Sequence, residues 1–163
     1  MAKRLYLFIS FCILFSPHTN SQSLKKAYRH YEKGEILKLK ETLVKLDEKS
    51  VENSGKYFMY SLLYLEQRED RNILRQAYQN IITGKENYSG LDTKELEELT
   101  ELGIDISTID SIEDVIDSLE YQFVREENSV EEYRRYLSGY PNSTFVDDAT
   151  ARWTSLEFKI TTN

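Results

Sequence analysis

Apolar residues recur at spacings of three and four along nearly the whole chain from residue 24 to residue 160. This spacing matches the 3.6-residue turn of an α-helix and gives each segment one apolar face. It predicts eight helices, over residues 24–33, 35–47, 54–67, 71–83, 93–102, 107–127, 129–138 and 143–160. Short helices joined by tight turns pack as antiparallel hairpins. The predicted fold class is therefore all-α, with hairpins at about 24–47, 54–83, 93–127 and 129–160.

Polar and glycine residues mark where these helices begin and end. Gly34 is the predicted turn of the first hairpin, and Gly84 is predicted to end the fourth helix. Two pairs have the spacing of capping boxes, namely Asp92 with Glu95 and Ser129 with Glu132. The segment 54–67 is apolar nearly all round, which indicates a helix covered on more than one side, although its aromatic residues also favour strands.

Two helices near the C-terminus have a well-defined inward face. The helix at 107–127 has a narrow apolar seam made of Ile109, Ile112, Ile116, Leu119 and Phe123. The last helix is expected to turn five side chains inward, those of Phe145, Ala149, Trp153, Leu156 and Ile160.

The start of the chain has the order of a secretory signal peptide. Lys3 and Arg4 form a basic start, and residues 5–15 are an unbroken apolar run. A run of about 11 residues suits a signal peptide, whereas a membrane-spanning helix needs about 20. Pro17 and small or polar residues follow, so we expect residues 1–21 to be removed after Ser21. An uncleaved anchor is the alternative.

The expected cleavage leaves residues 22–163 without a cysteine and with a single histidine. Cys12 does not fit the site of lipid attachment, because apolar residues continue after it. A secreted domain of this composition is expected to depend on its apolar core alone, with no disulfide. No membrane span is expected after cleavage.

The mature chain offers little for catalysis. His30 is its only histidine, and no cysteine remains after cleavage. A Cys–His dyad and a Cys-rich zinc site are therefore excluded. Neither a phosphate-binding loop of the GxxxxGK type nor an EF-hand loop occurs. Paired carboxylates could support glycoside hydrolysis, but the candidates Glu97–Glu98 and Glu131–Glu132 lie on predicted helices. We therefore expect no enzyme activity and no catalytic, metal-binding or cofactor-binding residue; a hydrolase that uses these carboxylates is the alternative.

Charge is unevenly distributed along the chain. The formal net charge is -7, which disfavours nucleic acid as a partner. Residues 22–83 contain 12 basic and 9 acidic residues, a net charge of +3, whereas residues 84–163 contain 7 and 19, a net charge of -12. The acidic part would be repelled by anionic surfaces. It either keeps the protein soluble or receives a basic partner.

An internal similarity indicates a repeated unit. Residues 117–121 read DSLEY and residues 154–158 read TSLEF, an offset of 37 residues, and Ile160 matches Phe123 at the same offset. A helix–turn–helix fits between the two copies, as in a helical solenoid. Chance similarity between two amphipathic helices is the alternative.

The segment 128–158 resembles the tetratricopeptide-like repeats of bacterial cell-envelope proteins, such as outer-membrane assembly lipoproteins and Tol–Pal coordinator proteins. The resemblance depends on Tyr133, Tyr136-Leu137, Tyr140-Pro141-Asn142-Ser143 and Ala149. It implies a short α-solenoid and a periplasmic location, although no lipid-bearing cysteine is present. It also implies a protein or peptide partner in the envelope rather than a substrate or cofactor.

Arrays of this family bind partners in a groove lined by the first helix of each hairpin. In this chain the first two such helices have five tyrosines as candidate partner-binding residues: Tyr28, Tyr31, Tyr57, Tyr60 and Tyr64. Tyrosine brings a large contact area with few rotatable bonds. The predicted function is a non-enzymatic scaffold for protein–protein interaction. The alternative is an N-terminal module of a longer envelope protein whose activity lies in a C-terminal region missing here.

Overall fold

The structure is a computed structural model that describes residues 22–46 and 50–161. The predicted signal peptide, residues 1–21, lies outside the described residues. Over the described ranges the chain forms eight helices and no strand, which confirms the all-α class. The helices are α1 (Gln22–Glu32), α2 (Ile36–Val44), α3 (Ser50–Leu65), α4 (Arg71–Ser89), α5 (Thr93–Thr100), α6 (Ile106–Glu127), α7 (Val130–Gly139) and α8 (Val146–Thr161).

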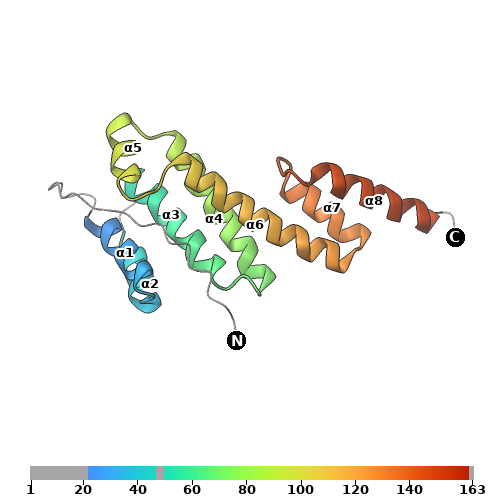
Figure 1. Ribbon diagram of the computed structural model, residues 1–163, viewed down its shortest axis with the longest axis horizontal. Coiled ribbons are helices and arrows are strands. Elements are labelled where there is room, and N and C mark those ends of the chain that lie inside the picture. Colours follow the sequence, from blue (N-terminus) through green and yellow to red (C-terminus); the bar gives the residue numbers. More distant parts are fainter. Residues whose placement is uncertain (1–21, 47–49, 162–163) are drawn as a thin grey trace.

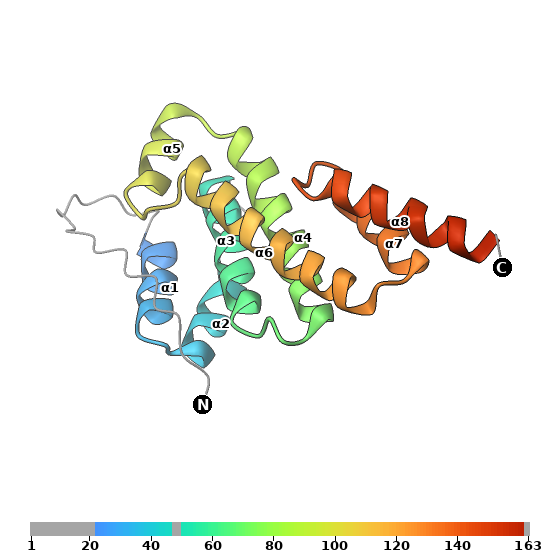
Figure 2. The same ribbon diagram turned by 45° about the vertical axis from the view of Figure 1, so that its right-hand side comes forward.

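The helices pack largely on their neighbours in the chain. Helices α1 and α2, α3 and α4, and α7 and α8 form contacting pairs, and α3 at the centre also contacts α1, α2, α5 and α6 (Figure 1). Helix α6 packs on α4, and α7 packs on α6. The α1–α2 pair and the α7–α8 pair lie at opposite ends of the molecule (Figure 2).

The predicted end of the fourth helix at Gly84 is wrong, because α4 continues through this residue to Ser89. A Cβ atom added at Gly84 would lie 3.4 Å from the Phe58 nitrogen and from the Ser54 carbonyl oxygen. The Ser54 hydroxyl donates to the Gly84 carbonyl oxygen at 2.9 Å. Gly84 therefore lies at a close contact between α3 and α4, where a Cβ atom would only just fit, and does not act as a helix stop.

The other predicted helix ends agree with the structure except for the side chain of Glu132. The Asp92–Glu95 capping box is present with both hydrogen bonds, and Gly34 has the positive φ of a left-handed turn between α1 and α2. At α7 the Ser129 hydroxyl accepts from the Glu132 backbone N–H. The Glu132 carboxylate does not complete that box, because it lies in buried ion pairs with neighbouring arginines.

Helix α6 has two buried faces, of which the sequence predicted one. The predicted seam packs against the main core, with Ile109 and Ile116 fully buried. In its C-terminal half a second face, which includes Tyr121 and Val124, joins α7 and α8 in a separate smaller core. Asp117 and Glu120 are also buried on this second face. Their charges would ordinarily indicate a solvent-exposed side of the helix.

The inward face of α8 is shorter than predicted. Ala149 is fully buried, but Ile160 is 68% exposed, so the expectation for Ile160 is wrong. Helix α8 packs on α7, and its last turn passes beyond that support. The two similar segments also lie in different surroundings, since Tyr121 is 3% exposed and its counterpart Phe158 is 68% exposed.

Candidate functional site

Helix α3 has one stripe that its neighbours leave partly open. Phe58 and Met59 lie on its covered sides and are buried. Tyr57, Tyr60 and Tyr64 are only half-buried, and their spacing of three and four places them on one face. The Tyr60 and Tyr64 rings stack with centroids 6.2 Å apart. The structure thus places three of the five predicted tyrosines together, and we call these three the tyrosine stripe.

The hydroxyl groups of the tyrosine stripe lie close enough to influence one another. Burial raises the pKa of Tyr60 above its usual value, and the nearby phenols of Tyr64 and Tyr57 raise it further. The Tyr60 phenol therefore stays neutral in ordinary conditions. A surface of this kind presents apolar ring faces together with hydroxyls that both donate and accept hydrogen bonds.

The other two predicted residues, Tyr28 and Tyr31, help to fasten α1. Both pack against the main core, as Tyr60 and Tyr64 also do. Burial raises the pKa of Tyr31 to about 12, with further contributions from the negative charge of Glu66, from Tyr28 and from a hydrogen bond to Glu66. Because Glu66 directly follows α3, this bond ties the end of α1 to the end of α3.

The two groups of tyrosines lie on different sides of α3. Leu24 of α1 packs at Gly55, where an added Cβ atom would lie 2.2 Å from Leu24 Cδ2. At about 100° per residue, the tyrosine stripe lies roughly 140° to 200° around the helix from Gly55. Among the described residues no ring contact joins a tyrosine of α1 to one of α3. The five predicted residues therefore do not form one continuous patch.

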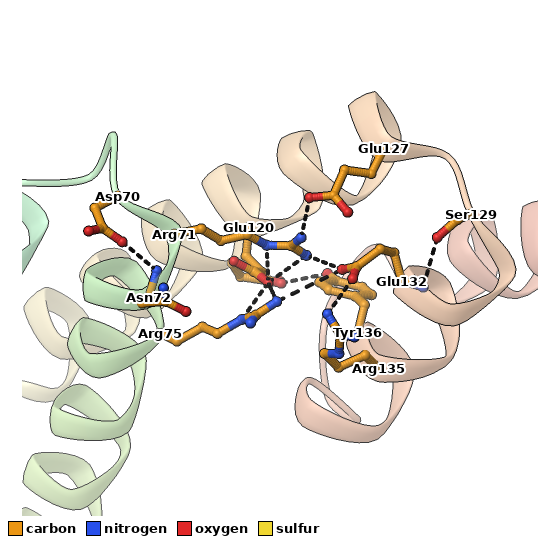
Figure 3. Close-up of polar contacts among 11 residues, drawn as sticks. Asp70, Arg71, Asn72, Arg75, Glu120, Glu127, Ser129, Glu132, Arg135 and Tyr136 are labelled. Atoms are coloured by element: carbon orange, nitrogen blue, oxygen red, sulfur yellow. Dashed lines mark hydrogen bonds and ion pairs between the residues drawn. The ribbon is translucent and has the colours of Figure 1, made fainter.

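A second polar arrangement, which sequence reasoning missed, lies where α4, α6 and α7 meet (Figure 3). The Arg71 guanidinium on α4 lies 2.9 Å from Glu120 Oε1, 2.8 Å from Glu127 Oε1 and 2.6 Å from Glu132 Oε2. Glu120 is 2% exposed and Glu132 is 6% exposed. Burial lowers the pKa of Arg71, but hydrogen bonds and attraction from Glu120 and Glu132 outweigh this and raise it. Arg71 thus stays charged and joins three helices.

Two further arginines complete this arrangement. Arg75 donates from Nε to Glu120 Oε1 at 3.1 Å, and Arg135 of α7 pairs with Glu132 Oε1. Three arginines thus face three glutamates, and we call this set the junction network: Arg71, Arg75, Arg135, Glu120, Glu127 and Glu132. Such a balanced set has the character of a structural joint, because each buried carboxylate is held by a guanidinium.

Tyrosine hydroxyls continue the junction on its α7 side. Tyr136 donates to the buried Asp117 carboxylate at 2.5 Å, and Tyr121 donates to Asp148 at 2.5 Å. The Tyr140 hydroxyl is buried without a hydrogen-bond partner among the described residues. Its ring lies 4.0 Å from that of Tyr78 on α4, measured between centroids. Burial is the largest cause of the raised pKa values of Tyr136 and Tyr140.

The two carboxylates of the predicted pair Glu131–Glu132 lie in different surroundings. Glu131 is exposed, whereas the adjacent Glu132 belongs to the junction network. His30 Nδ1 lies 2.6 Å from a Glu35 carboxylate oxygen, and hydrogen bonds from Lys38 first and then His30 lower the pKa of Glu35. Within the described ranges no three His, Cys, Asp or Glu side chains are grouped as metal ligands would be.

The junction network leaves a faint signal in the sequence. Arg71 and Arg75 are one turn apart on α4, and Glu120 and Glu127 are two turns apart on α6. These spacings place like charges on one face of each helix, which by itself costs stability. Such a pattern favours an opposing set of charges, but it does not identify which helix supplies them.

Comparison with models of protein families, with curated proteins and with solved structures finds nothing that matches this chain. Over residues 22–46 and 50–161, no helix combines the length and the apolarity that crossing a bilayer requires.

Proposed function

We propose that this protein is a non-enzymatic scaffold, exported to the cell envelope, that binds a protein or peptide partner through the tyrosine stripe of α3. The observation that carries the proposal is the position of the stripe. Helix α3 contacts other helices on its remaining sides, and the face that remains accessible is dominated by three tyrosines, with Lys56 one turn from Tyr60. Tyrosine is among the residues that contribute most to binding energy at protein interfaces.

The order of helix contacts supports a short tetratricopeptide-like array. The first helices of the predicted hairpins contact each other, α1 with α3 and α3 with α5, and α4 packs on α6. The pattern is incomplete, because within the described residues neither α5 with α6 nor α2 with α4 forms an extensive contact. Arrays of this kind present their first helices along one concave surface. The α7–α8 pair departs from this pattern, because it packs mainly on the C-terminal half of α6.

Replacing Tyr60 and Tyr64 together with serine tests the proposal. Removing two hot-spot rings is expected to weaken capture of envelope partners at least about tenfold. The measurement is a quantitative pull-down from native envelope extract, with circular dichroism to show that both proteins are folded. Tyr28→Ser is the control, because Tyr28 is also half-buried but belongs to α1 and not to the stripe. Undiminished recovery with the folded double variant would remove the stripe from the binding site.

Export is tested separately from binding. The apolar run of residues 5–15 and the small or polar residues before Gln22 support removal of a signal peptide. N-terminal sequencing of the protein isolated from its native cell is expected to begin near Gln22. A native protein that keeps Met1 and fractionates with the cytoplasm would contradict the envelope location.

A further inference from the structure

The α1–α2 hairpin differs in charge from the rest of the molecule. Residues 22–46 contain seven lysines and arginines and three glutamates, a net charge of +4 with His30 neutral. Residues 84–163 have a net charge of -12. Because this hairpin lies at the opposite end from α7 and α8 (Figure 1), the molecule has one basic end and a long acidic remainder.

Helix α2 has an aliphatic stripe that points outward. Leu39 and Leu43 on its inner side are fully buried, whereas Leu37 is 78% exposed and Val44 is 72% exposed. Leu37 and Val44 are seven residues apart and therefore lie on one face. They are the two most exposed large aliphatic side chains among the described residues.

Lysines border this stripe on both sides. Helical geometry places Lys40 on one flank of Leu37 and Val44, and Lys38 and Lys45 on the other, with the exposed Glu41 between the stripe and these two lysines. On the latter flank a shallow hollow of about 400 Å³ opens between α1 and α2, lined by Lys26, His30, Lys38, Glu41, Thr42 and Lys45.

Most of these cations are not neutralised within the protein. Lys38 pairs with Glu35 at 2.9 Å. Lys26, Lys40 and Lys45 form no ion pair with any part of the chain that the structure describes. The hairpin thus presents two protruding aliphatic side chains in surroundings with an excess of positive charge, in which Glu41 is the nearest carboxylate.

We propose that the outer face of α2, formed by Leu37, Lys40, Val44 and Lys45, docks on the surface of an anionic lipid bilayer. Aliphatic side chains bordered by lysines are the composition of interfacial helices, in which the apolar face enters the headgroup boundary and the lysines remain with the phosphates. The stripe protrudes and has no deep pocket beside it, which suits a fluid surface better than the fixed shape of a peptide ligand.

The acidic remainder does not oppose this orientation. Electrostatic repulsion is screened over about 8 Å at physiological ionic strength, and the acidic helices α7 and α8 lie at the far end of the molecule (Figure 2). The charge asymmetry therefore favours approach with the basic end first. This docking surface is separate from the tyrosine stripe and does not depend on the function proposed for it.

Vesicle sedimentation with the full chain tests the assignment. Vesicles that contain about 30% phosphatidylglycerol are compared with pure phosphatidylcholine vesicles, so that neutral vesicles report any binding by the apolar run at residues 5–15. The full chain is expected to prefer the anionic vesicles, and the preference is expected to fall as salt rises. Lys40→Glu with Lys45→Glu is expected to reduce the preference at least about tenfold, and Leu37→Ser with Val44→Ser about threefold or more.

Two matched variants separate a specific face from a general effect of charge or apolarity. Lys94→Glu with Arg125→Glu replaces exposed cations of α5 and α6 and changes the net charge as much as the double lysine variant does. Ile106→Ser with Val115→Ser removes two exposed aliphatic residues of α6. Both are expected to bind as the unchanged chain does. An equal loss in these controls, or no preference for anionic vesicles, would overturn the proposal.

Soluble competitors distinguish other anionic ligands. Neither millimolar glycerol phosphate nor a poly-glutamate peptide is expected to displace the chain from anionic vesicles. Displacement by glycerol phosphate would assign the hollow to a soluble anion. Tight binding of the peptide, with release from the vesicles, would assign the face to an acidic protein. Either result would overturn the lipid assignment.

Discussion

The body formed by α1–α6 and the hairpin formed by α7 and α8 are held in different ways. The body closes around aliphatic side chains from all six helices, including the fully buried Leu39, Leu74 and Ile109. The hairpin is joined to the body through the junction network and through tyrosine rings with polar tips, such as Tyr136 and Tyr140. One contact surface is almost entirely apolar and the other is largely charged and aromatic.

This difference separates stability from orientation. Aliphatic burial is favourable in nearly any arrangement, so it stabilises the body without requiring one exact register. Buried ion pairs offset their own desolvation only when the geometry is good. Arg71 meets glutamates of both α6 and α7, so the junction network sets the angle at which the hairpin leaves the body more than it adds to stability. The following changes test whether the body and the hairpin are held separately.

The largest effect is expected from breaking the junction network. Arg71→Met leaves the buried carboxylates of Glu120 and Glu132 without their main partner, which is expected to cost about 3–5 kcal/mol. Because the smaller core joins the hairpin mainly to α6 and is separate from the main core, release of the hairpin is expected before the body unfolds. Urea denaturation followed by tyrosine fluorescence and by circular dichroism should show two separate transitions. A single unchanged transition would show that the network does not hold the hairpin.

A substitution in the core of the body is expected to cost a comparable free energy of unfolding but to leave a single urea transition. Leu63 is buried in the main core, and Leu63→Ala should cost about 2–5 kcal/mol through lost burial and the cavity that remains. The urea midpoint should fall for the whole protein with no new transition. A loss confined to α7 and α8 would contradict the division drawn here.

Overpacking inside the hairpin is expected to have a smaller effect. Ala149 is fully buried where α8 crosses α7. Ala149→Leu should cost about 1–3 kcal/mol, because the added side chain forces the two helices apart. The neighbouring exposed Ala151 is the control, since Ala151→Leu should leave the urea midpoint nearly unchanged. Equal midpoints for both variants would show that α8 is not packed at Ala149.

Two tyrosines of the junction are expected to respond differently to loss of the hydroxyl. Tyr136→Phe removes the donor to the buried Asp117 carboxylate, which should cost about 1–3 kcal/mol at pH 7. Tyr140→Phe removes a buried hydroxyl that has no partner among the described residues, so its urea midpoint at pH 7 should be unchanged or slightly higher. Equal destabilisation by both would contradict these assignments.

The smallest effect is expected at alkaline pH, where stability changes gradually. The pKa of Tyr140 is raised in the folded state, first by burial and then by the charge of Glu120. A raised pKa means that the folded state holds this proton more tightly than the unfolded chain, whose tyrosines titrate near pH 10. Its contribution to stability is therefore complete below about pH 10 and is lost as the pH rises further. Tyr140→Phe should reduce the fall of the urea midpoint between pH 9 and pH 11, and an unchanged slope would refute this.

Sequence periodicity was sufficient for the helices but not for their partners. The seam of α6 was predictable because Ile109 and Ile116 repeat at helical spacing. Its second face was not, because Asp117 and Glu120 are charged, and their partners are distant in sequence: the Tyr136 hydroxyl of α7 for Asp117 and the arginines of α4 for Glu120. The role of Gly84 was not predictable for a similar reason, since it depends on the nearby backbone of α3 and not on its own helix.

The candidate site divides in the same way. Local spacing was enough to place Tyr57, Tyr60 and Tyr64 on one face of α3. The relation of Tyr28 and Tyr31 to that face depends on how α1 is rotated against Gly55, a tertiary contact that periodicity does not contain. Only the structure shows that the two groups of tyrosines lie on different sides of α3.

Hydrogen exchange measured by mass spectrometry tests most directly whether the molecule consists of an apolar body and a separately held hairpin. In the unchanged chain, amides of α7 and α8 are expected to exchange faster than those of α3 and α4, through openings that leave the body folded. Arg71→Met should accelerate exchange in α7 and α8 by at least about tenfold while α3 and α4 remain protected. Equal acceleration in both regions, or none in α7 and α8, would contradict this account.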